Sequence, residues 1–147
     1  MALHDVGKIA IPDRILLKPG RFDPDEYEIM KTHTTRGKEI IGKLGDVNTS
    51  MYLRHCEDIC HSHHERWDGK GYPDGFKGEK IPLAARLAAL ADVYDALVCA
   101  RVYKDAIPFS ESVNIIVDGK GTQFDPIVTD ALVAIQEEFM KIAKQYA

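Results

Sequence analysis

Two adjacent histidines, His63 and His64, stand just before a glycine-rich loop, 66–80, that contains Tyr72. Neutral imidazole is the commonest protein ligand for transition metals, and glycines let the backbone approach a ligand closely. The pattern therefore predicts a metal site that opens onto a substrate-binding loop. The alternative is a helix end followed by a glycine-rich turn, and one short motif does not exclude it.

A second candidate is the pair His4 and Asp5, with Lys8 one helical turn after His4 on the same face. A carboxylate oxygen together with imidazole nitrogen suits iron, manganese, zinc, cobalt or nickel better than magnesium or calcium. A carboxylate can also bridge two metals about 3.5–4 Å apart. The Lys8 ammonium could then hold a phosphate oxygen or assist the leaving group. The alternative is a helix-end pair with a solvated lysine.

Two further candidates lie on apolar helix faces. Asp92 has small apolar neighbours throughout 87–93, and an ionised carboxylate buried without a partner is too costly. Asp92 must therefore be paired, hydrogen-bonded or bound to metal, whereas a helix-to-helix salt bridge is favoured for Asp95. His33 falls on the apolar stripe of its helix, and a lone histidine there is more often a core residue with satisfied hydrogen bonds.

Two basic residues, Arg101 and Lys104, follow the helix that carries Asp92. Together they could bind phosphates, the arginine through its bidentate fork and the lysine as a point charge. On an unbroken helix Arg101 would point roughly opposite Asp92. Either the helix ends near residue 100, or these residues reach a distant part of a large ligand. A solvated basic helix end is the alternative.

The composition excludes several classes of protein. The 147 residues fit one domain with a real core, and 19 basic against 23 acidic side chains give a formal charge of −4. That balance argues against broad nucleic-acid binding, including DNA. The chain has no run of about 18 apolar residues, so we expect no membrane span. Its beginning also lacks the basic-then-apolar shape of a secretion signal.

The three cysteines, Cys56, Cys60 and Cys99, form no disulfide pattern, so we expect a cytoplasmic protein. Cys56, Cys60 and His64 share one helical face, and that spacing could bind zinc. Closed zinc sites usually draw on two paired ligand segments, so buried reduced cysteines are favoured.

The elements that must position these residues are predicted to be helices. The expected ranges are the last turns of a helix at 1–9, a helical or turn segment at 12–17, helices at 23–44, 51–64, 82–100 and 110–117, and a final helix from 125. The apolar stripe of the helix at 23–44 is Ile29, His33, Gly37, Ile40, Ile41 and Leu44. No strand pattern is convincing, and the glycine-rich loop spans 66–80. The sequence thus predicts an all-α bundle.

Taken together, these residues resemble the HD-GYP domain, a bacterial branch of the HD metal-dependent phosphohydrolases. The resemblance runs nearly end to end and rests on His4 to Ile9, Ile11 to Asp13, Lys18 to Gly20, Met30 to His33, His63 to Pro73, Ile81-Pro82, Ala91 to Leu97, Arg101 to Lys104 and Gly121 to Pro126. It implies a single domain over residues 1–147, folded as a helical bundle of HD-domain type with about five to seven helices.

The resemblance also implies a function. Members hydrolyse the bacterial second messenger cyclic di-GMP to linear pGpG, and some continue to GMP, with two or three divalent ions that are usually iron or manganese. The metal ligands implied by position are His4, Asp5, His33, His63, His64 and Asp92. Asp5 would bridge the metals and act in catalysis with Lys8. Tyr72, Arg101 and Lys104 would contact the substrate.

The family's first helices precede the His-Asp pair and supply another ligand histidine and, in three-metal members, a glutamate. Because the pair stands at residues 4 and 5, we expect this chain to lack them. A catalytically impaired nucleotide-binding or protein-interaction module is therefore one alternative, and a hydrolase of a mixed cyclic dinucleotide is another. A homodimer or a signalling-protein partner is also expected.

Overall fold

The computed structural model describes residues 3–98 and 108–146, and these ranges contain helices and no β-strand. The elements are the 3-10 helices η1 (Val6–Ala10) and η2 (Gly78–Lys80) and the helices α1 (Asp13–Leu16), α2 (Pro24–Lys31), α3 (His33–Leu44), α4 (Met51–Ser62), α5 (Leu83–Val98), α6 (Phe109–Asp118), α7 (Pro126–Ala134) and α8 (Gln136–Tyr146). The predicted all-α class is confirmed for the described part of the chain. None of these helices is long and apolar enough to cross a membrane.

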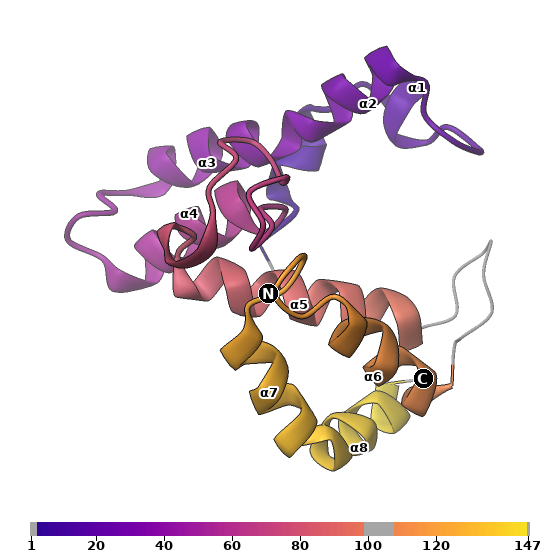
Figure 1. Ribbon diagram of the computed structural model, residues 1–147. Coiled ribbons are helices and arrows are strands. Elements are labelled where there is room, and N and C mark those ends of the chain that lie inside the picture. Colours follow the sequence, from indigo (N-terminus) through magenta and orange to yellow (C-terminus); the bar gives the residue numbers. More distant parts are fainter. Residues whose placement is uncertain (1–2, 99–107, 147) are drawn as a thin grey trace.

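Helix α5 joins two groups of helices (Figure 1). On one side it contacts α4, which packs against α3, and α3 in turn contacts η1. On the other side it contacts α6 and α7. A single buried cluster fills this second side, made of Leu90, Tyr94, Leu97, Ile116, Phe124, Val128 and Leu132. Because α5 belongs to both groups, it fixes the position of its own residue Asp92 relative to both.

The helix expected over 23–44 is interrupted at Thr32. It begins as predicted: Pro24 is the first helical residue, and Asp23 and Glu26 on either side of it form a reciprocal capping box. At the interruption the Thr32 hydroxyl donates to the Ile29 carbonyl at 2.6 Å. The next two side chains likewise bond carbonyls three residues back. Such side-chain bonds compete with the helical ladder, so the chain continues as a separate helix, α3.

The apolar stripe was predicted correctly in its middle and incorrectly at its end. His33, Gly37 and Ile41 are buried on α3 as expected. Leu44 is 63% exposed, because it stands on the last turn of α3, where the chain leaves for the loop to α4.

The final helix, expected to run on from residue 125, is divided into two. Helix α7 ends at Ala134, and α8 brings Phe139 edge-on to Tyr94 with 5.2 Å between ring centroids.

The segment before Ile11 is a turn followed by η1, instead of the expected helix end. Gly7 explains how this segment lies so close to α3. A Cβ built on Gly7 would stand 1.9 Å from the His33 carbonyl oxygen and 2.5 Å from the Gly37 nitrogen. Only glycine permits this approach, which brings the beginning of the chain against the first turn of α3.

Candidate metal centre and adjoining pocket

Three imidazoles from two helix ends meet in one cluster. His33 is the first residue of α3, whereas His63 and His64 follow the last residue of α4. One ligand nitrogen of each ring lies within 4.8 Å of those of the other two. The neighbouring rings of His63 and His64 have centroids 4.1 Å apart. The described residues therefore contain a histidine cluster that could hold a metal ion.

Hydrogen bonds to the backbone orient two of these rings. His33 Nδ1 lies 2.8 Å from the Met30 carbonyl oxygen, and His63 Nδ1 lies 2.8 Å from that of Ile59. Since a carbonyl only accepts, each Nδ1 donates its proton and each Nε2 keeps a lone pair. Metal-binding histidines commonly use their second nitrogen in this way.

The lone pairs of these two histidines have no hydrogen-bond partner. Both Nε2 atoms are buried, and His33 as a whole is only 1% exposed. Buried polar atoms are nearly always satisfied, so two unpaired acceptors side by side require an explanation. A cation between them supplies one, and the residues present thus fit a metal.

The Asp5 carboxylate lies between this histidine cluster and a second group of side chains, which consists of His4, Lys8 and Asp92. Its Oδ1 lies 3.5 Å from His33 Nε2 and 3.9 Å from His63 Nε2, and it too is buried without a hydrogen-bond partner. Its Oδ2 lies 3.2 Å from His4 Nε2 and accepts a hydrogen bond from Lys8 Nζ at 2.6 Å. The two oxygens therefore face different sets of ligand atoms.

Asp92 reaches the second group from α5, with its Oδ1 3.6 Å from His4 Nε2. The hydrogen bond from His4 is the main reason that the pKa of Asp92 lies below its usual range. Burial opposes ionisation of Asp5, but hydrogen bonds from His4 and Lys8 outweigh it and lower the pKa of Asp5 as well. Both carboxylates are therefore ionised at neutral pH, as metal ligands must be.

Burial keeps the three clustered imidazoles neutral. It lowers the pKa of His33 and of His63, and it lowers the pKa of His64 to about 3. A neutral imidazole has a free lone pair, whereas a protonated one has none. The ring nitrogens can therefore coordinate a cation at physiological pH.

The structure brings together the side chains of His4, Asp5, Lys8, His33, His63, His64, Tyr72 and Asp92. Arg101, Lys104 and Cys99 lie outside the described residues. Cys60 is buried and reduced, with its thiol donating to the Leu3 carbonyl, and Cys56 is a half-buried free thiol. The described metal-capable group that includes His64 contains no cysteine.

The glycine-rich loop folds back onto the end of α4. A Cβ on Gly71 would meet the Arg66 nitrogen at 2.4 Å and the His64 carbonyl oxygen at 2.5 Å, so this contact requires glycine. The buried Glu65 carboxylate accepts hydrogen bonds from the backbone nitrogens of Asp74 at 2.7 Å and Gly75 at 3.0 Å. These bonds fix the part of the loop that carries Tyr72.

Tyr72 lies directly against the histidine cluster. Its ring stacks on that of His64, with 4.8 Å between centroids and an interplanar angle of 25°. Burial, with a smaller contribution from Tyr27, raises the pKa of Tyr72 above its usual range. Its phenol therefore stays protonated and can donate a hydrogen bond.

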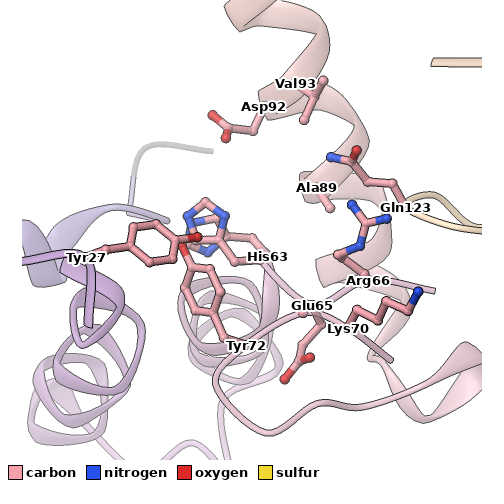
Figure 2. Close-up of a pocket in the computed structure, with 12 residues that line it drawn as sticks. Tyr27, His63, Glu65, Arg66, Lys70, Tyr72, Ala89, Asp92, Val93 and Gln123 are labelled. Atoms are coloured by element: carbon pink, nitrogen blue, oxygen red, sulfur yellow. The ribbon is translucent and has the colours of Figure 1, made fainter. Parts of the chain in front are cut away.

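A pocket of about 310 Å³ adjoins the histidines. Figure 2 shows Tyr27 and Tyr72 on one side of it, Arg66 and Gln123 on the other, and Asp92 reaching in from α5. The volume lies at the small end of the range for ligand pockets. It could admit part of a nucleotide next to the metal centre.

The sequence patterns gave no site role to Tyr27 or Glu65. Tyr27 is a surface tyrosine on α2, and nothing in its spacing connects it with a loop much later in the chain. Glu65 follows the histidine pair, but its partners are backbone nitrogens, which no motif displays. Only the fold reveals either contact.

A protein-family model described as an HD domain matches residues 1–128 of this chain. A cyclic di-GMP phosphodiesterase of Vibrio cholerae is 48% identical over 145 residues, which cover 98% of this chain and 30% of that relative. A 3'3'-cGAMP-specific phosphodiesterase of the same organism is 40% identical over 140 residues, covering 95% of this chain and 26% of the relative. The chain spans about a third of the length of the curated relatives it matches.

The fold resembles a solved structure as well. A cyclic GMP-AMP specific phosphodiesterase of V. cholerae superimposes with a TM-score of 0.61 and 24% sequence identity. The match covers 95% of this chain and 36% of that chain. At this level of identity the likeness shows the fold alone.

Proposed function

This chain belongs to the HD domain family, and from that premise we propose that it is a metal-dependent phosphodiesterase that hydrolyses cyclic di-GMP to pGpG in bacterial second-messenger signalling. One observation carries the proposal: unpaired ligand atoms of His33, His63 and Asp5 converge beside a pocket of nucleotide-fragment size. The similarity to named cyclic di-GMP phosphodiesterases adds the choice of substrate.

Family membership implies that the site binds divalent metal, and the geometry supports two positions. One would use His33, His63, His64 and Asp5 Oδ1. The other would use His4, Asp92 and Asp5 Oδ2. Histidine nitrogen with carboxylate oxygen suits iron or manganese, which we propose as the ions.

The reaction adds water across one phosphodiester bond, so that a P–O3′ bond breaks, a P–O bond to the water oxygen forms, and the 3′ oxygen gains a proton. Bound divalent ions would lower the pKa of water and neutralise charge on the phosphoryl oxygens. Asp5, with one oxygen facing each set of ligand atoms, would keep the two sets in a fixed relative position. The Lys8 ammonium would bind a phosphoryl oxygen or protonate the 3′ oxygen. The neutral Tyr72 phenol would donate to the substrate. Arg101 and Lys104 would hold its second phosphate or a guanine.

Turnover by the purified chain tests the proposal. The protein would be loaded anaerobically with Mn²⁺ or Fe²⁺, its metal content measured, and cyclic di-GMP offered, with products separated by liquid chromatography. We expect pGpG with either metal, and further incubation shows whether GMP follows. His63→Ala should lose both metal and activity, whereas His55→Ala, at an exposed histidine on α4, should keep both. A folded protein that binds cyclic di-GMP without hydrolysing it under either metal would favour the binding-module alternative.

A second substrate, 3'3'-cGAMP, is favoured by the relative that is 40% identical and specific for it. Parallel assays with both dinucleotides decide between them. We propose cyclic di-GMP as the better substrate because the more similar relatives are named for it. A cytoplasmic location and a homodimer or signalling partner stay predictions of the sequence.

A further inference from the structure

Tyr27 borders the pocket without any role in the metal chemistry proposed above. Tyr27, on α2, is 47% exposed, and its ring lies beside that of Tyr72, with 6.4 Å between centroids and an interplanar angle of 80°. Both tyrosines line the 310 Å³ pocket, and Figure 2 shows them together on one side of it. The pocket thus has an aromatic wall that starts at the metal centre and continues onto α2.

This aromatic wall, formed by Tyr27 and Tyr72, is ordered by its neighbours. Tyr72 is stacked on His64. The Lys31 ammonium lies 5.5 Å from the centre of the Tyr27 ring and 5.7 Å from that of Tyr72, and it also pairs with Glu28 at 2.6 Å. A cation at such distances attracts both rings. Because the rings are already ordered, stacking on a ligand would cost little further side-chain entropy.

We propose that the aromatic wall is a stacking subsite for a purine base of the substrate. The inference rests on the proposed function, because it concerns the nucleotide bound in the same pocket. Aromatic side chains bind bases through stacking whatever hydrogen bonds the base makes. The aromatic wall begins beside the proposed metal ligands, because Tyr72 stacks on His64. When a phosphate of the substrate is bound at the metal ions, the base of the same nucleotide can reach this wall. Tyr27 is then a substrate-binding residue outside the glycine-rich loop.

Equilibrium binding separates this subsite from catalysis. The manganese-loaded protein would be titrated calorimetrically with GMP and with ribose 5-phosphate, which carries the sugar and phosphate without the base. We expect the protein to bind GMP more tightly. Tyr27→Ala should weaken GMP binding by about tenfold and leave ribose 5-phosphate unchanged. Tyr27→Phe keeps the ring and should bind GMP like the unaltered protein.

The matched control is Tyr52→Ala, which removes a tyrosine that is 68% exposed at the far end of α4, roughly 16 Å along the helix from His63. It should bind both ligands normally. The subsite is overturned if Tyr27→Ala binds GMP normally, or if it weakens both ligands equally. GMP binding that depends on Tyr27, in a protein that does not hydrolyse cyclic di-GMP, would overturn the proposed function and leave the subsite standing.

Discussion

Among single residues, Lys8 links the candidate metal centre to the proposed reaction. Its ammonium contacts Asp5 Oδ2 at 2.6 Å and is partly open to solvent, so it could also reach a phosphoryl oxygen. We predict that Lys8→Met lowers kcat by about 10²-fold, because it removes a positive charge placed where negative charge develops. Metal content per chain should be retained, because all the proposed ligands remain. Steady-state kinetics and metal analysis on the same samples check both statements.

The control for this prediction is Lys43→Met, which removes an exposed lysine near the end of α3. Its kcat should match that of the unaltered protein. If Lys8→Met lost metal in proportion to activity, the lysine would act by holding Asp5, and its proposed contact with the substrate would be wrong.

The sequence identified the candidate ligands where residue type conflicts with surroundings. Asp92 is an acid among small apolar residues, so the sequence alone required a partner for it. For His33 the apolar stripe favoured a core histidine, and only the family resemblance implied a metal ligand. Tyr27 creates no such conflict, because a half-exposed tyrosine on a helix is ordinary. The role proposed for Tyr27 rests on its contacts with Tyr72 and Lys31, and the contact with Tyr72 exists only after folding.

Among the elements, the close contact between η1 and α3 decides where Asp5 lies. We predict that Gly7→Ala lowers the free energy of unfolding by about 3 kcal/mol, because the added methyl meets backbone atoms of α3 that cannot move aside individually. The affinity for manganese should fall as well, because η1 would have to move away from α3, and this movement would shift Asp5 away from His33. Urea unfolding and metal titration are the measurements.

Gly42→Ala is the matched control on the same helix. A Cβ there meets nothing within 4 Å, and Gly42 lies inside α3 on an exposed face. This substitution should raise the free energy of unfolding by about 0.5–1 kcal/mol, because glycine within a helix is less favourable than alanine. Similar losses in both variants would contradict the role given to Gly7.

The beginning of α2, the helix that carries Tyr27, should respond to acid. The Lys18 ammonium donates a hydrogen bond to the Glu26 carboxylate, and the Asp23 backbone nitrogen donates another. Together they lower the pKa of Glu26 below its usual value of 4.5. Because the folded-state pKa is lowered, this stabilisation is present above about pH 4.5 and is lost as the pH falls through the folded-state pKa. Glu26→Gln should therefore lose less stability between pH 6 and pH 3 than the unaltered protein.

Urea midpoints at the two pH values check this prediction, with Glu39→Gln on α3 as a control for removing an exposed carboxylate. An equal acid loss in Glu26→Gln and the unaltered protein would show that the α2 cap does not contribute.

Helix existence was predictable from apolar spacing and caps, whereas helix interruptions were not. Asp23 and Pro24 mark the start of α2 in the sequence itself. The interruption at Thr32 depends on three consecutive side chains that bond the carbonyls of residues 29–31. Threonine and histidine often occur within helices without such bonds, so the pattern alone cannot reveal the break. Yet this break places His33 in the first turn of α3, where its Nδ1 reaches the Met30 carbonyl.

Across the whole molecule, a partly buried ion pair ties α5 to the start of α7. Arg86 Nη1 lies 2.5 Å from Asp125 Oδ2, and the Asp125 side chain is only 1% exposed. The other oxygen of Asp125 accepts from the Ile127 nitrogen at 2.7 Å and caps α7. Just before it, the carbonyls of Thr122 and Gln123 accept from the glycine-rich loop. One ion pair therefore anchors both the second helical group and the far side of the pocket.

A double-mutant cycle measures this anchor. Arg86→Met should lower the free energy of unfolding by about 3–5 kcal/mol, because it leaves an ionised carboxylate buried without its partner. Asp125→Asn keeps the oxygen that caps α7 and should cost less, about 1–2 kcal/mol. The double variant buries no unpaired charge, so its loss should be smaller than the sum of the single losses by about 1–3 kcal/mol, as measured by urea unfolding. Strict additivity would mean that Arg86 and Asp125 stabilise their own helices separately. The position of Arg66 and Gln123 on the far side of the pocket would then need another explanation.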